Sequence, residues 1–273
     1  GEAEGLRFIK LSKLESIVTI ETASIVEDMV VSNVCCVKNT LDTQDKVTFI
    51  KELYVGGAAN LGNGNRVRAL VCEGNITLGR GTIIERWIDA AGTIQAEEEC
   101  NMGVSASCRG ALFLSPTCVF KRLYAFPVVA GKEMIEAPAN INGMDVRNLF
   151  VTETDNVGAE RNLSQVPQHS QKHGSIITDL SLVVGAFSVV YGHIKTHGAL
   201  ILEENVVIAG NLFAEGIIHL GPGCRIAGTV FSQDRIIVGP GVVIGVPGKI
   251  KSVVAKNGVT LEPGAMVFGY VMT

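Results

Sequence analysis

Apolar and polar residues follow a pattern that repeats every 18 residues in the C-terminal part of the chain. Four successive blocks begin at Gly174, Gly192, Gly210 and Gly228. When each block is numbered 1 to 18, apolar residues recur at positions 3 and 5, 9 and 11, and 15 and 17. A spacing of two places both members of a pair on one face of a short strand, and the gap of four between pairs indicates a corner. Three pairs per block therefore predict a three-sided coil.

The same register extends over most of the chain. Further blocks begin at Glu15, Asn33, Lys51, Arg68, Arg86 and Val104, and at Lys251 after a five-residue insert, Val246–Ile250. The Lys51 block is one residue short, which a deletion at a corner explains. Of the 66 inward positions in these eleven blocks 58 are apolar, against about 31 expected from the 47% average. The polar exceptions are Thr19, Thr43, Asn65, Thr82, Thr178, Ser188, Thr196 and Ser232.

Stacked coils of this kind make an all-β, three-sided, single-stranded parallel β-helix. Adjacent coils lie about 4.8 Å apart, so equal positions form columns along the axis. The backbone groups of each coil pair with the coils on either side, and burial then leaves no backbone donor without a partner. A β-sandwich with regularly spaced strands is the alternative fold, but its turns rarely keep one register over so many blocks.

The pattern divides the chain into four parts. They are an N-terminal cap or tail over 1–14, N-terminal coils over 15–126, an excursion over 127–173, and C-terminal coils over 174–273.

The excursion is the stretch in which the 18-residue register is lost. Tyr124 and Phe126 just before it still fit the inward positions of a coil starting at Arg122. Within it we expect short strands such as Arg147–Thr152. Long insertions in repeat proteins map to surface loops and often carry function. A covering loop without a function and a run of degenerate coils are the alternatives.

Composition agrees with a narrow core rather than with a membrane protein. The 273 residues are 47% hydrophobic and 5% aromatic, with 31 glycines, and the mean hydropathy is +0.33. No run approaches 18 apolar residues, so no membrane span is expected. The net charge is −4, and the basic residues form no tract, which argues against a nucleic-acid partner.

The seven cysteines have no zinc-type spacing and indicate a reducing compartment. A cytoplasmic location is favoured, with membrane association as the alternative. The chain begins at Gly1 rather than Met, so removal of an upstream signal or anchor stays open as an alternative. Cys100 and Cys118 share position 15 on adjacent coils, within disulfide distance. We nevertheless expect free thiols.

Two groups of polar residues are candidates for chemistry. His193 and His197 occupy positions 2 and 6 of one coil, and His173 precedes the coil below. One of them would serve as general base in an acyltransferase, although outward-pointing surface residues are the simpler interpretation. Glu97–Glu99, Glu203 and Glu204 are interpreted as solvated corners rather than as paired acids of a glycosidase. No metal or cofactor is expected.

The stretch from Gly198 to Gly269, with its G-x-[IL]-x₅-[LIV]-x-[LIV]-G spacing, resembles the bactofilins, the polymer-forming cytoskeletal proteins of bacteria. The resemblance covers Gly174–Gly269 and rests on core positions. It implies a right-handed triangular β-helix that stacks end to end into non-polar filaments without nucleotide. Polymerisation in that family needs a hydrophobic terminal coil. The matching positions here are Val259, Leu261, Val267 and Val271, and Tyr270 lies beside them where the sequence ends in mid-coil.

The expected function is therefore a bactofilin-like structural protein whose partner is another copy of itself or a scaffolded protein. This chain has about six additional coils and the excursion, which bactofilins lack. Hexapeptide-repeat acyltransferases, which form left-handed coils, are the second resemblance, carried by pairs such as Leu61-Gly62 and Leu220-Gly221. A carbohydrate-binding surface module is the third hypothesis. An enzyme is thus less expected than a structural protein, and an acyltransferase is the enzyme to expect.

Overall fold

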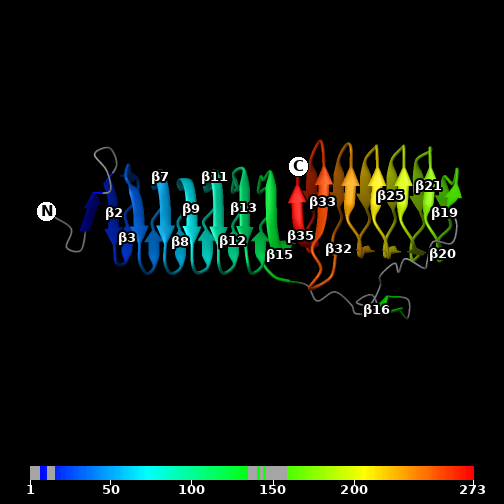
Figure 1. Ribbon diagram of the computed structural model, residues 1–273, viewed down its shortest axis with the longest axis horizontal. Helices are drawn as coiled ribbons and strands as arrows, with labels where there is room; N and C mark the ends of the chain where they lie inside the picture. The colour runs from blue at the N-terminus through cyan, green and yellow to red at the C-terminus, as the bar shows by residue number, and fades with distance from the viewer. Residues whose placement is uncertain (1–6, 11–15, 135–139, 142–143, 146–158) are drawn as a thin grey trace. The chain divides into compact units, whose positions relative to one another are not determined.

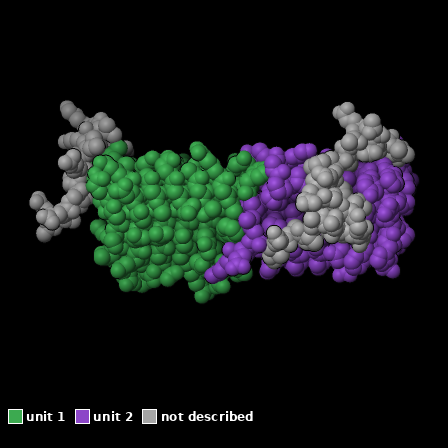
Figure 2. Space-filling view, turned by 90° about the horizontal axis from the view of Figure 1, so that it is seen from below, with its two compact units in different colours: residues 1–126 green, residues 127–273 purple. Residues whose placement is uncertain are grey.

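The computed structural model describes residues 7–10, 16–134, 140–141, 144–145 and 159–273. Its secondary structure is all β, and its parallel strands stack into a β-solenoid of about 13 turns with about 18 residues per coil (Figure 1). The predicted fold class is thereby confirmed. The chain divides into two compact units, residues 1–126 and 127–273 (Figure 2).

Unit 1 is built from three columns of strands, one for each side of the coil. The first side holds β2 (Ser16–Ile20), β5 (Val34–Val37), β7 (Thr48–Val55), β9 (Arg66–Cys72), β11 (Ile83–Ala90), β13 (Ser105–Cys108) and β15 (Arg122–Ala130), whose residues from Pro127 onward belong to unit 2. The second side holds β3 (Ala23–Ile25), β6 (Leu41–Thr43), β8 (Ala59–Leu61), β10 (Ile76–Leu78), β12 (Ile94–Ala96) and β14 (Leu112–Leu114). The third side holds β4 (Val30–Val31) and the first residues of β7, β9 and β11.

Unit 2 repeats this arrangement. Its first side holds β18 (Glu160–Arg161), β21 (Ile176–Thr178), β24 (Ile194–Thr196), β27 (Leu212–Ala214), β30 (Val230–Ser232) and β33 (Lys251–Ala255). Its second side holds β19 (Gln165–Val166), β22 (Leu182–Val184), β25 (Leu200–Leu202), β28 (Ile218–Leu220), β31 (Ile236–Val238) and β34 (Val259–Leu261). Its third side holds β20 (Gln171–His173), β23 (Val189–Tyr191), β26 (Val207–Ile208), β29 (Arg225–Ile226), β32 (Val243–Ile244) and β35 (Met266–Met272), whose end returns to the first side.

Burial follows the predicted columns closely. The inward positions of the coils that start at Gly192, Gly210 and Gly228 are all buried, as are those of the coils that start at Arg68 and Arg86. Polar residues at inward positions are buried as well, including Asn65, Thr82, Thr178, Thr196 and Ser232. The main deviation is Met29 in the first coil, which is 48% exposed. A terminal coil has a neighbour on one side only, so its inward side chains are covered less completely.

Two details of the predicted register are wrong, one at each end of unit 1. In the first coil Val18 is buried and pairs with Cys35, so Ile17 and Thr19 do not occupy the inward positions. In the last coil Leu123 is buried and pairs with Ala106. A slip of one residue exchanges the two faces of a strand, so one residue fewer at a corner shifts the inward assignments on one side of that corner.

At the C-terminal end of unit 1, the predicted inward residues of the coil starting at Arg122 are wrong. Ala125 is fully buried there, whereas Tyr124 and Phe126 are only half-buried. The pairing of Ser107 with Tyr124 spans 17 residues rather than 18. The missing residue moves the large aromatic rings to the outer face and puts a leucine and an alanine into the narrow core.

The block that begins at Lys51 is one residue short because of a deletion at a corner, as predicted. Pairing of β7 with β9 spans 18 residues at Phe49–Val67 but 17 at Glu52–Ala69. The next pairing, β9 with β11, returns from 17 at Val67–Ile84 to 18 at Ala69–Trp87. The missing residue therefore lies at the corner between the third side of one coil and the first side of the next, and the buried columns stay aligned.

The stretch expected as an excursion contains one coil at its end. Strands β18, β19 and β20 pair in parallel with β21, β22 and β23, so regular stacking begins at Glu160 rather than at Gly174. A small antiparallel pair, β16 (Asn140–Ile141) with β17 (Met144–Asp145), lies farther upstream. The strand expected over Arg147–Thr152 lies outside the described residues.

Additional chain segments pair with the first coil of unit 1 and with the last coil of unit 2. Strand β1 (Arg7–Lys10) runs antiparallel to β2 at the N-terminal end of unit 1. In unit 2 the Ala130 amide donates to Ala265 O at 2.9 Å, and the Gly264 amide donates to Ala130 O at 2.7 Å. The last residues of β15 therefore bond to the chain just before β35.

One corner of every coil has a left-handed backbone that the repeat pattern does not reveal. Twelve residues at position 14 have φ between 54° and 80°: Asp28, Lys46, Gly64, Gly81, Glu99, Thr117, His169, Phe187, Asn205, Gly223, Gly241 and Gly264. This region of backbone space favours glycine, yet seven of the twelve residues are not glycine. The corner is therefore imposed by coil stacking rather than by local residue preference.

Five hydroxyl or thiol side chains at position 15 bond in the same way. They donate to a backbone carbonyl at position 12 of the preceding coil, over 2.9 to 3.2 Å. The donors and acceptors are Thr82 and Gly62, Cys100 and Gly79, Cys118 and Glu97, Ser188 and Pro167, and Cys224 and Glu203. A small side chain with a hydroxyl or thiol is thus suited to this position because it satisfies a corner carbonyl inside the core.

Candidate functional site

The terminal coil of unit 2 is the first candidate, because self-association was expected there. Strand β34 is the last strand of its six-stranded sheet and pairs only with β31 among the described strands. Its inward residues Val259 and Leu261 are half-buried. Their partners one coil below, Ile236 and Val238, are fully buried. The inner face of the solenoid is therefore partly open to solvent at this edge.

The other residues predicted to mediate self-association differ in burial from Val259 and Leu261. Val267 and Val271 lie on β35, point into the core of the solenoid and are fully buried, whereas Tyr270 on the same strand is 41% exposed. Strand β35 pairs with β32 through Val267 and with β33 through Tyr270 and Val271. The structure thus distinguishes two core positions, one outward ring, and the partly open pair of Val259 and Leu261.

Each candidate histidine is held by its own partners. The Asn211 amide donates to Nδ1 of His193 at 2.9 Å, and the His193 amide donates to Oγ of Ser175 at 3.2 Å. A neutral imidazole has one free lone pair, and in His193 that lone pair already accepts a backbone proton. His173 stacks on Tyr191, with ring centroids 4.7 Å apart. These contacts hold adjacent coils together.

His197 lies in a column of charged groups. Its Nδ1 is 2.8 Å from Oε1 of Glu215 on the next coil, and its Nε2 is 3.5 Å from Oδ1 of Asp179 on the preceding coil. The three side chains are exposed, at position 6 of three successive coils. Both ring nitrogens of His197 are therefore directed at carboxylates along the wall of the solenoid.

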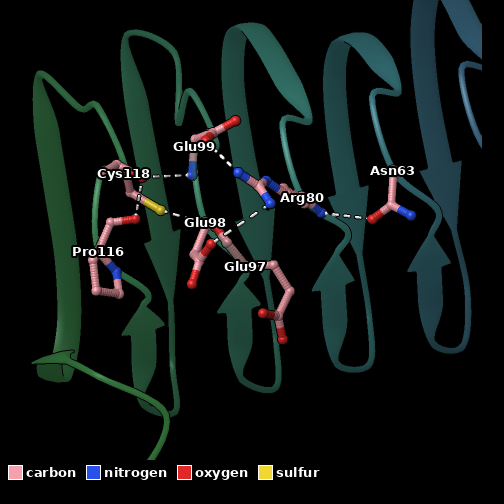
Figure 3. Close-up of polar contacts among 8 residues, drawn as sticks. Asn63, Arg80, Glu97, Glu98, Glu99, Pro116 and Cys118 are labelled. Atoms are coloured by element: carbon pink, nitrogen blue, oxygen red, sulfur yellow. Dashed lines mark hydrogen bonds and ion pairs between the residues drawn. The ribbon is translucent and has the colours of Figure 1, made fainter.

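The acidic run Glu97–Glu99 forms part of a polar corner rather than a carboxylate pair. One Arg80 Nη lies 2.6 Å from Glu99 Oε1, and the other lies 4.0 Å from Glu98 Oε2 (Figure 3). Hydrogen bonding and attraction from Arg80 hold the pKa of the Glu99 carboxyl below its ordinary value. A general acid of a glycosidase needs a raised pKa, so this shift has the opposite sign.

The second acidic pair also serves a corner. The Ala186 amide donates to Oε2 of Glu203 at 2.9 Å. The backbone carbonyl of Glu203 accepts the Cys224 thiol at 3.0 Å. Glu203 therefore binds the coil before it through its side chain and the coil after it through its backbone.

The seven cysteines are free thiols, and five of them are buried. Burial raises the pKa of Cys35 and of Cys108 to about 11, and that of Cys224 to about 12. Such thiols are protonated and weakly reactive near neutral pH. Cys118 differs, because it is only half-buried and hydrogen bonding with the Cys100 thiol lowers its pKa.

Outward aromatic rings of unit 2 stack along the axis. His169 lies against Phe187 with centroids 5.2 Å apart, and Phe213 lies against Phe231 with centroids 5.3 Å apart. The Lys195 ammonium lies 5.5 Å from the centroid of the Phe213 ring. Because the rings stack nearly in parallel, their faces cover one another. These stacked contacts join adjacent coils on the outer wall of unit 2.

The described residues contain no group of three or more His, Cys, Asp or Glu side chains that could hold a metal ion. In the same part of the chain no helix is long and apolar enough to cross a membrane.

Comparison with known proteins gives no relative: no family model, no curated protein and no solved structure matches this chain.

Two features of these sites were missed in the sequence. The open edge at β34 follows from which side of the last coil lacks a further strand, and the 18-residue pattern gives no indication of that side. The partial exposure of Cys118 depends on its position at a corner directly after the exposed residues Pro116 and Thr117; Pro116 and Cys118 are labelled in Figure 3. The dipeptide Pro116-Thr117 is a turn signal directly before a cysteine, and it is the one sequence feature that would have indicated that exposure.

Proposed function

We propose that this chain is a bactofilin-like structural β-helix that associates with further copies of itself, or scaffolds partner proteins, through its terminal coils. The observation that supports the proposal most directly is the edge formed by β34. Val259 and Leu261 are inward core residues that remain half-exposed, and they lie on the last strand of a sheet. Another strand added there would bury both side chains and continue the parallel ladder.

The side chains on the walls of the solenoid give further support. The histidines and acids that were candidates for catalysis are bonded to neighbouring coils, as described for His193, His197, Glu99 and Glu203. Such contacts stabilise stacking in a repeat protein, whose stability is a sum over neighbouring coils. Assembly through the terminal coils would leave these wall contacts in place, because a further coil is added only at an end of the stack.

Leu261→Lys tests the proposal at the edge itself. A lysine at an edge strand opposes strand addition, because its charge would have to be buried between two chains. We expect the wild type to have a light-scattering mass that rises above the monomer with concentration, and the Leu261→Lys variant to remain monomeric. Lysine at Val267 or Val271 is less informative, because both residues are fully buried and their replacement would disrupt the core as well.

Thr260→Lys is the matched control. Thr260 lies on the same strand between the two edge residues but points outward and is exposed. This variant adds the same charge without changing the inner edge, so its mass should follow the wild type. Thermal melting of all three proteins separates assembly from folding. Equal masses for the wild type and Leu261→Lys at every concentration would exclude the proposal for this edge.

A further inference from the structure

Cys100 and Cys118 occupy the same position on adjacent coils of unit 1. The Val119 amide donates to Cys100 O at 2.8 Å, and the Met102 amide donates to Val119 O at 2.8 Å. These bonds fix the parallel pairing of Asn101 with Val119. The Cα atoms of the two cysteines are therefore one strand spacing apart, about 4.8 Å, which lies within the range of disulfides.

The two thiols also point in the same direction. Cys100 Sγ donates to Gly79 O at 3.2 Å, and Cys118 Sγ donates to Glu97 O at 3.1 Å, one coil farther along (Figure 3). Each sulfur thus makes the same contact with the corner of the coil before it. The two side chains therefore lie one above the other in the same column of the coil.

Cys100 and Cys118 differ in burial, and this difference decides which of them reacts first with a reagent from solvent. Cys100 is fully buried, whereas Cys118 is half-buried and follows the exposed residues Pro116 and Thr117. Once Cys118 is ionised, the Cys100 thiol can donate to its thiolate; this contact, together with burial, raises the pKa of Cys100, and it lowers the pKa of Cys118. Cys118 is therefore the thiol that ionises first and meets a reagent from solvent.

No other two cysteines share these properties. Cys72 and Cys108 are in one column but are separated by Ala90. Cys35 points inward and Cys36 outward along one strand. Cys224 shares position 15, but the residues at this position on the neighbouring coils are Val206 and Val242.

We propose that Cys100 and Cys118 form a reversible redox-modification site, a dithiol that a low-molecular-weight disulfide such as glutathione disulfide converts into a bond between adjacent coils. This inference does not depend on the proposed role in assembly.

The chemistry is two successive thiol–disulfide exchanges. The Cys118 thiolate attacks one sulfur of glutathione disulfide, whose S–S bond breaks to release one glutathione and leave a mixed disulfide on Cys118. Cys100 Sγ, on losing its proton, then attacks Cys118 Sγ, and the second glutathione leaves. Two protein thiols are oxidised, one disulfide is reduced to two thiols, and both cysteine protons pass to the glutathione released.

The geometry makes this bond reversible. Cβ atoms in register on parallel strands lie about 4.8 Å apart, whereas a relaxed disulfide needs about 3.5 to 4.5 Å. Closing the bond must draw the two coils together and so strains them. Strained disulfides have higher reduction potentials, which makes them labile rather than permanent.

The test uses the full chain, fully reduced, freed of reductant and incubated with glutathione disulfide. Digestion followed by fragmentation mass spectrometry should find Cys118 linked to Cys100 and not to Cys108, which lies on the same tryptic peptide as Cys100. Dithiothreitol should restore both thiols. In the Cys100→Ser variant the reaction should stop at a stable glutathione adduct on Cys118, formed at least about tenfold faster than any adduct on Cys224.

Serine is a suitable replacement because Ser188 occupies the same position in unit 2 and donates to Pro167 O. Cys118→Ser should leave Cys100 without an adduct, and Cys224→Ser, the matched control, should not change the cross-link. A Cys118 adduct that persists in the wild type without cross-linking would overturn the proposal. Modification of Cys100 in the Cys118→Ser variant at the wild-type rate would also overturn it.

Discussion

The Cβ atom that Gly192 lacks would lie 2.1 Å from the carbonyl oxygen of Gly174 on the preceding coil. The same contact recurs at Gly210 over Gly192 and at Gly228 over Gly210, each at 2.3 Å. Real Cβ atoms do not approach a carbonyl oxygen so closely. Gly192, Gly210 and Gly228 are therefore required by the contact between coils, and this column of glycines sets how closely that corner can stack.

Gly192→Ala should consequently lower stability far more than an alanine at a glycine with free space around it. Gly241 is such a position: its φ is +63°, and nothing lies within 4 Å of an added Cβ. We expect Gly241→Ala to lower the free energy of unfolding by about 1 kcal/mol, from backbone conformation alone. Gly192→Ala must displace a backbone, and a loss of about 3 kcal/mol or more is expected. Denaturant unfolding of both variants measures the difference; equal losses would contradict the packing argument.

Replacing a non-glycine residue at the left-handed corner should have the opposite effect. Lys46 has φ 57° and an exposed ion pair with Glu27 at 3.2 Å. Gly64 has the same conformation one coil later. Lys46→Gly removes an exposed ion pair worth little and relieves the left-handed backbone, so we expect a gain of about 0.5 to 1 kcal/mol.

Lys38→Gly is the control for that gain. Lys38 is also an exposed lysine with an exposed partner, Glu21 at 2.6 Å, but it does not belong to the left-handed column. Glycine there should destabilise unit 1 by about 0.5 to 1 kcal/mol through the entropy of the unfolded chain. Chemical denaturation of the two variants should shift the midpoint in opposite directions. A shift in the same direction would show that the corner is not strained.

The position 15 donors predict which core substitutions are tolerated. Ser188 is fully buried; its hydroxyl donates to Pro167 O at 2.9 Å and accepts from the Ser170 amide at 3.1 Å. Ser188→Ala leaves both backbone groups without this partner, and we expect a loss of about 1 to 3 kcal/mol. Ser188→Cys should cost less, because Cys224 makes the equivalent bond to Glu203 O in the same unit. Thermal unfolding should rank serine first, cysteine second and alanine third.

Sequence periodicity predicts the buried columns well because it reports the one property that every coil shares, an inner face without water. It fails where a corner loses a residue, as at Val18 and Leu123, since the apolar pattern fits either neighbouring register at the end of a unit. A fit to apolar residues also accepts Tyr124 and Phe126 as inward, although rings of that size do not suit the narrow core. Pairing with the next coil decides the register there.

The candidate sites were less predictable because they depend on contacts between coils. The sequence places His193 and His197 on the outer wall, but their partners Asn211 and Glu215 belong to the next coil. It also places Cys100 and Cys118 in one column. Only the structure shows that one thiol is enclosed and the other is near solvent. Residue spacing gives the column, and exposure follows from the corner next to it.

Two exposed carboxyls of unit 1 have lowered pKa values for different reasons, and salt should separate them. Hydrogen bonds from the backbone and side-chain amides of Asn63 lower the pKa of Asp45. For Glu99 the lowering comes from Arg80, through a hydrogen bond and charge attraction. A depressed folded-state pKa adds stability above the unfolded value, near pH 4, and this is lost as the pH falls through the folded pKa.

Raising the salt to 1 M reduces the Debye length to about 3 Å and weakens attraction between exposed charges. Hydrogen bonds from the neutral Asn63 amides are little affected. We therefore expect carboxyl-carbon NMR titration in 1 M salt to move the Glu99 pKa toward its ordinary value and to leave that of Asp45 low. Asp45→Asn keeps an acceptor for the Asn63 amide without a titrating group, so its melting temperature should fall less than that of the wild type between pH 6 and pH 3. If salt moved both pKa values equally, charge rather than amide hydrogen bonding would govern Asp45, and the corner amides of the coil would not be what holds its carboxylate.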